Sequence, residues 1–276
     1  MADNPTARIR ELGARLWAAR EAAGVGRTEL ARSLGLAMPT VARFELGRRE
    51  PTRTNLALML GYCRVPAEES AYILDLAEAS RHKCWVRPHG SRLPEAVPSV
   101  LFQYQAANAI ACYDPHGIPP LFQSVDYIDA DLGRRCGDGI EVSEHRLARK
   151  AYRGLLVRDN RPRTVCYLHE SALRSLPVDE ETRRSQLLAL VMASGSNEAT
   201  IRVVPVEHEH AVGAAGFSSL RFDEYPPLVV QPAETVTLIV EGPEHIAAYA
   251  AAITRLTRLA LSELDSRELL CRLSAE

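Results

Sequence analysis

The feature that most constrains the fold is a very short gap between two helices near the N-terminus. The hydrophobic pattern predicts one helix over Arg27–Leu34, which Gly35 ends. A second helix is expected over Met38–Leu46, so that only Leu36 and Ala37 lie between the two. A connection this short forces the helices to cross at a steep angle instead of continuing along one axis. The spacing therefore predicts helix-turn-helix geometry.

Three more helices are expected around this pair. The first runs from Thr6 to Ala23, Thr52 caps a fourth, and Pro66 opens a fifth. Glu29 is expected to reach back to the open amides at the start of its own helix, as half of a capping box. Glycine enters the left-handed conformation at little cost, so three glycines are expected to end the first three helices: Gly24, Gly35 and Gly47. Five short helices predict an all-α bundle over residues 1–81.

One side of the helix over Met38–Leu46 is expected to face DNA. Val41 and Phe44 have the spacing of inward-pointing anchors, so the side chains around them at the N-terminal half point outward. In a helix-turn-helix module these outward side chains meet base edges in the major groove. Four residues are therefore candidates for reading bases: Met38, Pro39, Thr40 and Arg43.

The N-terminal segment is basic although the chain as a whole is not. The formal charge of the chain is -2. Between Arg8 and Arg64, however, eleven arginines stand against five acidic residues. Such a local excess of positive charge is typical of a surface that faces phosphates. Five arginines are candidates for phosphate contacts: Arg20, Arg27, Arg48, Arg49 and Arg53.

A set of residues spread over the whole module carries a family resemblance. They are Arg20, Gly24, Glu29, Leu30, Ala31, Leu34, Gly35, Val41, Phe44, Glu45, Gly47, Arg48 and Pro51. This set resembles the Xre/Cro-type helix-turn-helix family of repressors, which implies binding to double-stranded DNA. The family usually has serine and then glutamine where this chain has Gly26 and Arg27, and serine where it has Ala37. Arg27 is thus able to bind phosphate or read guanine, whereas Ala37 supplies neither a cap nor a phosphate contact.

A change of composition separates this module from the rest of the chain. Residues 82–98 contain Pro88, Gly90, Pro94 and Pro98 and predict a linker. Helices are then expected over 99–113, 142–156, 180–193 and 244–264, with another that contains Tyr127, Ile128 and Leu132. Strands are expected over 164–168, 200–205, 217–222, 228–231 and 235–240. Because strands and helices do not alternate regularly, residues 99–276 predict an α+β regulatory or partner-binding domain.

The second domain carries a resemblance of its own, in residues 106–127, 170–173, 217–222 and 260–262. These stretches resemble the C-terminal domain of actinobacterial WhiJ-type, antitoxin-like regulators. The family generally reads V-P-G-L-L-Q-T where residues 118–124 read I-P-P-L-F-Q-S. The resemblance implies a cytoplasmic transcriptional regulator, often paired with a small protein that is encoded nearby.

The sequence contains no recognisable catalytic or cofactor motif. Nucleophile elbow, phosphate-binding loop, dinucleotide-binding turn and zinc-protease patterns are all missing. Two groups carry side chains able to bind a metal, His82 with Cys84 and His89, and the run Glu207-His208-Glu209-His210. A linker explains the first group more simply, and a solvated loop the second. Cys112, Cys136 and Cys166 are interpreted as structural rather than redox-sensing. We expect no enzymatic activity, no catalytic residue, no cofactor and no metal.

These observations leave three functional hypotheses. The first is a homodimeric transcriptional regulator on a pseudo-palindromic operator, with half-sites about 34 Å apart. The alternative is an antitoxin-like protein that sequesters a small partner protein and autoregulates its own operon. The third is a sensor whose second domain binds a ligand or metal. The chain has no run of eighteen apolar residues and its first residues are polar, so a cytoplasmic location without membrane contact is expected.

Overall fold

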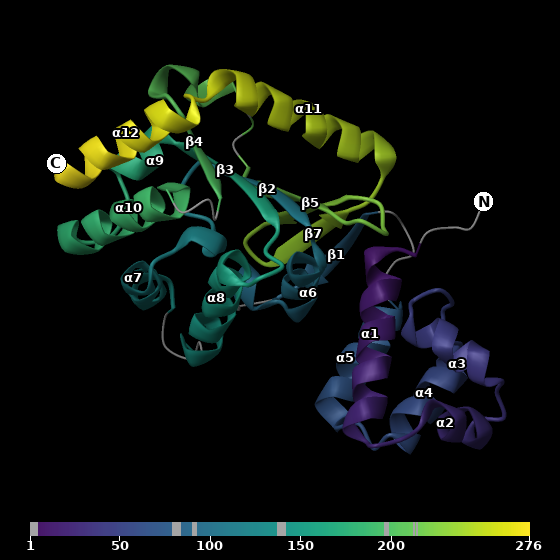
Figure 1. The fold of residues 1–276 in the computed structure, drawn as a ribbon. Coiled ribbons are helices and arrows are strands. Elements are labelled where there is room, and N and C mark those ends of the chain that lie inside the picture. The colour runs from purple at the N-terminus through teal and green to yellow at the C-terminus, as the bar shows by residue number, and fades with distance from the viewer. Residues whose placement is uncertain are drawn as a thin grey trace. The chain divides into compact units, whose positions relative to one another are not determined.

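A computed structural model describes residues 5–78, 84–89, 93–136, 142–195, 199–211, 213 and 215–276 (Figure 1). The chain divides into two compact units, Met1–Trp85 and Val86–Glu276. Both the N-terminal all-α bundle and the α+β class of the second unit agree with the prediction from sequence. None of the helices in the described ranges combines the length and apolarity that a membrane span requires.

The described part of unit 1 contains five helices, as the sequence predicts. They are α1 (Ala7–Ala22), α2 (Arg27–Ser33), α3 (Met38–Glu45), α4 (Arg53–Tyr62) and α5 (Ala67–Glu78). The core is formed by apolar side chains at helical spacing, among them Leu12, Leu16, Leu30, Val41 and Phe44, all at most 2% exposed. Burial of one face of each helix supplies most of its stability, because helices this short are marginal in isolation.

Local signals set the ends of these helices. The Thr52 hydroxyl accepts a hydrogen bond from the backbone N–H of Asn55 at 3.2 Å and so caps α4. The three glycines that were expected to stop helices have positive φ angles of 65–66°: Gly24, Gly35 and Gly47. The capping box at α2 is a correction, since the Glu29 carboxylate accepts a hydrogen bond from the Tyr62 hydroxyl at 3.0 Å instead. A donor on α4 therefore replaces the local backbone donor.

The described part of unit 2 is built on a seven-stranded sheet with the order β1-β7-β6-β5-β2-β3-β4, whose strand β1 begins two residues before the unit boundary. The strands are β1 (Cys84–Pro88), β2 (Ala109–Asp114), β3 (Arg163–His169), β4 (Thr200–Val204), β5 (Phe217–Arg221), β6 (Leu228–Pro232) and β7 (Val236–Val240). Strands β2, β3 and β4 run parallel, whereas β5 pairs antiparallel with both β2 and β6, and β6 with β7. The sheet is therefore mixed.

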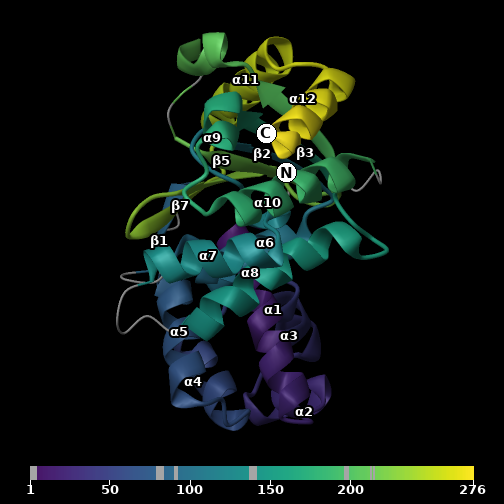
Figure 2. The ribbon, with the colours of Figure 1, turned by 90° about the vertical axis from the view of Figure 1, so that its left-hand side faces the viewer.

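Helices cover both faces of the sheet (Figures 1 and 2). On one face α11 (Pro243–Leu259) packs against a core that includes Tyr113, Tyr167, Phe217 and Leu256. The helices α6 (Pro98–Ala106) and α8 (Val142–Val157) lie on the opposite side. The remaining elements are α7 (Val125–Arg135), α9 (Glu170–Arg174), α10 (Glu180–Gly195), α12 (Glu263–Ala275) and the short 3-10 helices η1 (Pro94–Ala96), η2 (Pro120–Phe122) and η3 (Val206–Ala211).

Two helices expected in this unit are corrected by the structure. The segment 99–113 forms α6 and then strand β2, because Ile110 and Cys112 are buried in alternation and β2 pairs with strands on both sides. Tertiary pairing here outweighs the helical preference of an alanine-rich stretch. The segment 244–264 is also divided, since α11 ends at Leu259 and Ser262 caps the separate helix α12.

The residues expected to form a linker, 82–98, contain regular structure where they are described. Strand β1 lies at the edge of the sheet beside β7, and η1 follows it. Trp85 is only 2% exposed, and the His89 N–H donates to the Thr235 carbonyl at 3.0 Å. Proline is compatible with an edge strand because its missing N–H breaks no ladder bond there. The same proline content thus suits a linker or an edge strand.

Candidate nucleic-acid interface

The outer side of α3 presents the residues that the sequence marks as base-reading. Met38 is 44% exposed, Pro39 and Arg43 are also exposed, and Thr40 is half-buried. On the inner side Val41 and Phe44 are buried. Pro39 lies in the first turn of the helix, where an amide would have no intrahelical partner. The helix therefore exposes Met38, Pro39 and Arg43 on its outer side, and Thr40 in part.

The position of α3 is fixed by direct contact between two backbones. A Cβ atom on Gly13 of α1 would lie 2.6 Å from the Gly47 nitrogen and 2.6 Å from the Phe44 carbonyl oxygen. A Cβ atom on Gly47 would lie 2.9 Å from the Cα atom of Arg10. These distances are shorter than carbon atoms tolerate, so α1 meets the end of α3 without room for a methyl group. The sequence signal for this contact is a glycine inside a helix, where it otherwise costs stability.

A buried carboxylate anchors the C-terminal end of α3. Glu45 has a side-chain exposure of 1% and accepts hydrogen bonds from Arg20 Nε at 2.6 Å and from Arg27 Nε at 2.8 Å. Arg20 also pairs with Glu21 at 2.8 Å and donates to the Val25 carbonyl at 2.9 Å. The hydrogen bond to Glu45 raises the pKa of Arg20.

The structure therefore places Arg20 in a buried ion pair, whereas the sequence predicts a contact with phosphate. This arginine is 5% exposed and its guanidinium lies in the ion pair with Glu45. Moving it to a phosphate would leave Glu45 buried without its closest partner, which is costly. Arg27 shares Glu45 but keeps a side-chain exposure of 38%, so it remains partly open to solvent.

The other three candidate phosphate residues are on the surface. Arg48 and Arg49 are exposed in the turn after α3, and their backbone N–H groups donate to the Arg43 carbonyl at 2.8 and 3.1 Å. Arg53, at the start of α4, is 82% exposed and lies 3.1 Å from Glu78. A surface ion pair of this kind contributes about 0–1 kcal/mol and is weakened by salt. Arg48 and Arg49 thus lie in the turn at the C-terminal end of α3, and the Arg49 guanidinium lies 5.9 Å from the centroid of the Phe44 ring.

One structural arginine was missed at the sequence level. Arg8 is 2% exposed and donates to the carbonyl oxygens of Leu76 and Ala77, at 3.2 and 3.0 Å, and to Glu50 at 2.8 Å. It ties α1 to the end of α5 and to the segment after α3. A sequence rich in arginine offers no local signal that separates this buried residue from its exposed neighbours.

Residues considered for metal or redox chemistry do not gather into a site in the described ranges. No group of three or more histidine, cysteine, aspartate or glutamate side chains is close enough there to hold a metal ion. His82 and the side chains of Glu209 and His210 lie outside the described residues. Burial raises the pKa of the Cys166 thiol well above its ordinary value, and burial also raises that of Cys136. Both changes disfavour a reactive thiolate.

Two family models match the chain, one in each unit. The family model described as a domain of unknown function (DUF5753) matches residues 101–272, and a helix-turn-helix domain model matches residues 11–72. No match was found among curated proteins. Among solved structures, the archaeal chromatin protein TrmBL2, whose structure is described as showing a novel mode of DNA binding, is 11% identical over 86% of this chain and 87% of that chain. The TM-score of this comparison is 0.33.

Proposed function

The chain belongs to the family defined by the domain of unknown function DUF5753. Because its N-terminal unit matches a helix-turn-helix domain, we propose that it is a sequence-specific DNA-binding transcriptional regulator. The observation that carries the proposal is the outer side of α3. Met38, Pro39 and Arg43 are exposed together on a helix whose inner side is held by backbone contact and a buried ion pair. A helix held this rigidly suits recognition of bases in the major groove.

In this proposal some candidate residues contact bases and others contact phosphates. Arg43 and Thr40 hydrogen-bond to base edges, while Met38 and Pro39 make apolar contacts there. Arg48, Arg49 and Arg53, with a contribution from the half-exposed Arg27, bind phosphates on either side of the groove. Arg20 supports α3 through Glu45 and touches no phosphate.

The finer parts of the proposal concern assembly. The regulator acts in the cytoplasm as a homodimer on a pseudo-palindromic operator, as in the Xre/Cro-type and actinobacterial WhiJ-type regulators that the sequence resembles. Unit 2 then serves to bind an effector or a partner. The alternative, an antitoxin-like protein that sequesters a small partner, uses the same DNA-binding module for autoregulation.

The first test identifies the operator and then measures affinity. Genomic fragments are captured with the purified full-length chain, and binding of the enriched fragment is followed by fluorescence anisotropy. Arg43→Ala is expected to weaken binding by about 1–3 kcal/mol, the discrimination typical of one arginine–guanine pair. Arg255→Ala removes an equally charged, exposed side chain from α11 of unit 2 and serves as the control, with parental affinity expected. Equal affinities for the parent and the Arg43 variant would exclude base reading by α3.

The second test separates phosphate contacts from base contacts. Arg48→Ala is expected to weaken binding to all sequences alike and to reduce the slope of log K against log salt by about one unit. Arg43→Ala is expected to change the sequence preference more than the salt slope. An unchanged slope for the Arg48 variant would contradict the assignment of the turn after α3 to phosphates.

Co-purification distinguishes the homodimeric regulator from the antitoxin-like alternative. A homodimeric regulator binds its operator as the purified chain alone. An antitoxin-like protein is expected to retain a short protein when purified from its natural host and to change its DNA affinity when that protein is removed. Measuring operator affinity before and after separation of the two decides between these outcomes.

A further inference from the structure

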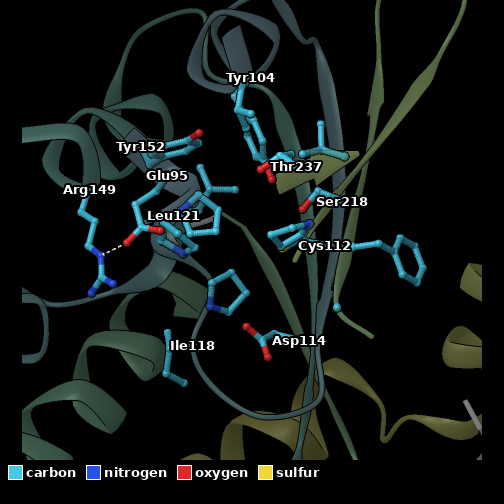
Figure 3. Close-up of a pocket in the computed structure, with 18 of the residues that line it drawn as sticks. Glu95, Tyr104, Cys112, Asp114, Ile118, Leu121, Arg149, Tyr152, Ser218 and Thr237 are labelled. Carbon is cyan, nitrogen blue, oxygen red and sulfur yellow. Dashed lines mark hydrogen bonds and ion pairs between the residues drawn. The ribbon is translucent and has the colours of Figure 1, made fainter. Parts of the chain in front are cut away.

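Unit 2 contains a cavity that the DNA-binding proposal does not use. Its volume is about 360 Å³, within the range of about 300–1,000 Å³ that is typical of small-molecule sites. The walls come from η1, α6, α8 and the strands β2, β5, β6 and β7, together with the segment that leads into η2 (Figure 3). Every residue of the lining belongs to unit 2.

Among the residues that the structure describes, three buried polar atoms of this lining have no hydrogen-bond partner. They are Gln123 Oε1, the Tyr152 hydroxyl and Thr237 Oγ1, on side chains that are at most 5% exposed. The side-chain amide of Gln123 donates to the Ile118 carbonyl at 2.7 Å, so the carbonyl end alone is left over. A buried polar group without a partner costs about 1–3 kcal/mol. Three of them around one cavity are what a site for a polar ligand provides.

The unpartnered groups approach the cavity from different walls. Tyr152 comes from α8 and Thr237 from β7, and Figure 3 shows Tyr152 beside Glu95 and Thr237 beside Ser218. Burial raises the pKa of Tyr152 well above its ordinary value, so its hydroxyl stays neutral and able to donate. Gln123 Oε1 only accepts. A ligand that satisfies all three groups must therefore carry at least one N–H or O–H donor.

The charges of the lining disfavour an anion. Arg149 is the buried cation, with 1% side-chain exposure, and it is already paired with Glu95 and with Asp131 at 2.8 Å. Asp114 adds a carboxylate, of which Oδ1 accepts from the backbone N–H groups of His116 and Gly117. The other arginine of the lining, Arg135, is 40% exposed. An anionic ligand would find no unpaired cation buried among the described lining residues, and an uncompensated charge is expensive to bury.

Aromatic and apolar side chains form the rest of the wall. The Tyr104 and Tyr152 rings meet edge to face, with centroids 4.9 Å apart and an interplanar angle of 83°. Phe217, Leu121 and Val230 complete the apolar lining. Such a surface favours a flat, apolar or aromatic body.

We propose that this cavity binds a small aromatic molecule that is neutral or carries one positive charge and has N–H or O–H donors. The aromatic body lies among Tyr104, Tyr152 and Phe217, while the donors reach Gln123 Oε1 and the hydroxyls of Tyr152 and Thr237. A positively charged group is accommodated on the side of Asp114. This site goes beyond DNA binding, and its existence does not depend on that proposal.

The test uses two probes that share a phenol ring and differ in charge. Tyramine is a cation at neutral pH and 4-hydroxyphenylacetate an anion, and each is titrated into the full-length chain by ligand-observed NMR and calorimetry. We expect tyramine to bind with a millimolar or lower Kd and the acid to bind at least about tenfold more weakly, a difference of about 1.4 kcal/mol. Failure of tyramine to bind, or equal binding of the acid, would overturn the proposal.

Two conservative variants tie the binding to the cavity. Tyr152→Phe and Thr237→Val each remove an unpartnered hydroxyl and keep the shape of the side chain. Each is expected to weaken tyramine binding at least fivefold while Tm stays the same or rises, because the penalty of the orphan hydroxyl disappears. Thr254→Val, on the exposed side of α11, is the matched control and should bind tyramine like the parent. Parental affinity in both cavity variants, or a clear fall of Tm in both, would contradict the proposal.

Discussion

The two units differ in how tightly their interiors are packed. Where α1 meets α3 in unit 1, backbone touches backbone and no room is left for a methyl group on Gly13. In unit 2, the sheet, α6 and α8 all contribute to the lining of a cavity of about 360 Å³, and three buried polar atoms of this lining have no partner among the described residues. A surface that reads DNA gains from a helix held in one position. A ligand site gains from space and from polar groups that the protein itself has left unsatisfied.

The two units also differ in what their buried ion pairs do. Glu45 lies under α3 with two arginines bonded to it, and this ion pair supports a surface elsewhere. Arg149 and its two carboxylates line the cavity itself and set which charge a ligand can carry. A paired buried charge is thus a scaffold in unit 1 and part of a candidate site in unit 2.

The largest effect is expected from breaking the buried ion pair. Glu45→Ala leaves Arg20 buried with Glu21 and the Val25 carbonyl as its remaining partners among the described residues, and should destabilise unit 1 by about 3 kcal/mol. Hydrogen exchange of peptides from α1 and α3, measured by mass spectrometry, reports this loss locally. Glu29→Ala removes an exposed carboxylate bonded to Tyr62 and is the control, with a change within about 0.5 kcal/mol. Similar exchange in the two variants would mean that the ion pair does not hold α3.

A smaller but sharper effect is expected from a single added methyl group in unit 1. Gly13→Ala forces apart the backbones of α1 and the end of α3 and should cost about 1–3 kcal/mol. Gly61→Ala is the matched control, because that glycine also lies in a helix but a Cβ atom there meets nothing within 4 Å. It should be neutral or stabilise α4 by up to about 1 kcal/mol. Thermal unfolding and hydrogen exchange in unit 1 measure the stability of both variants. Equal stability of the two variants would refute the close contact between α1 and α3.

The smallest effect is expected where a methyl group is added beside the cavity. Ser218→Thr keeps the hydroxyl in a strand that lines the cavity, and the free space should limit the cost to about 0.5 kcal/mol. The readout is hydrogen exchange of peptides from β5 and β6. A destabilisation as large as that of Gly13→Ala would show that unit 2 is packed as tightly as unit 1, and the comparison between the units would fail.

Much of unit 1 is predictable from sequence because its signals are local. Apolar spacing, threonine caps and glycine stops each act within a few residues, so the five helices and the outer side of α3 follow from them. The buried position of Arg20 could not be predicted from such local signals. Its partner Glu45 is twenty-five residues away, and an arginine in a basic segment looks the same whether it meets a phosphate or a buried carboxylate.

Unit 2 was less predictable because its structure depends on distant pairing. Strand β2 is alanine-rich and looks helical until β3 and β5 are placed beside it. Strand β1 lies in a segment whose prolines and glycine are equally typical of a linker. The cavity draws its wall from residues between Pro94 and Thr237, which share no motif. Such a site becomes visible only when the fold brings its residues together.

The central claim, that the outer side of α3 reads DNA sequence, is tested most directly by selecting bound sequences from a random DNA library. The selection is made in parallel with the parent chain and with Arg43→Ala, at the same salt concentration. The account predicts one enriched motif for the parent, and for the variant the same motif with the preference lost at one position of each half-site. The same motif with undiminished preference at every position in both chains, or no motif for the parent, would contradict it.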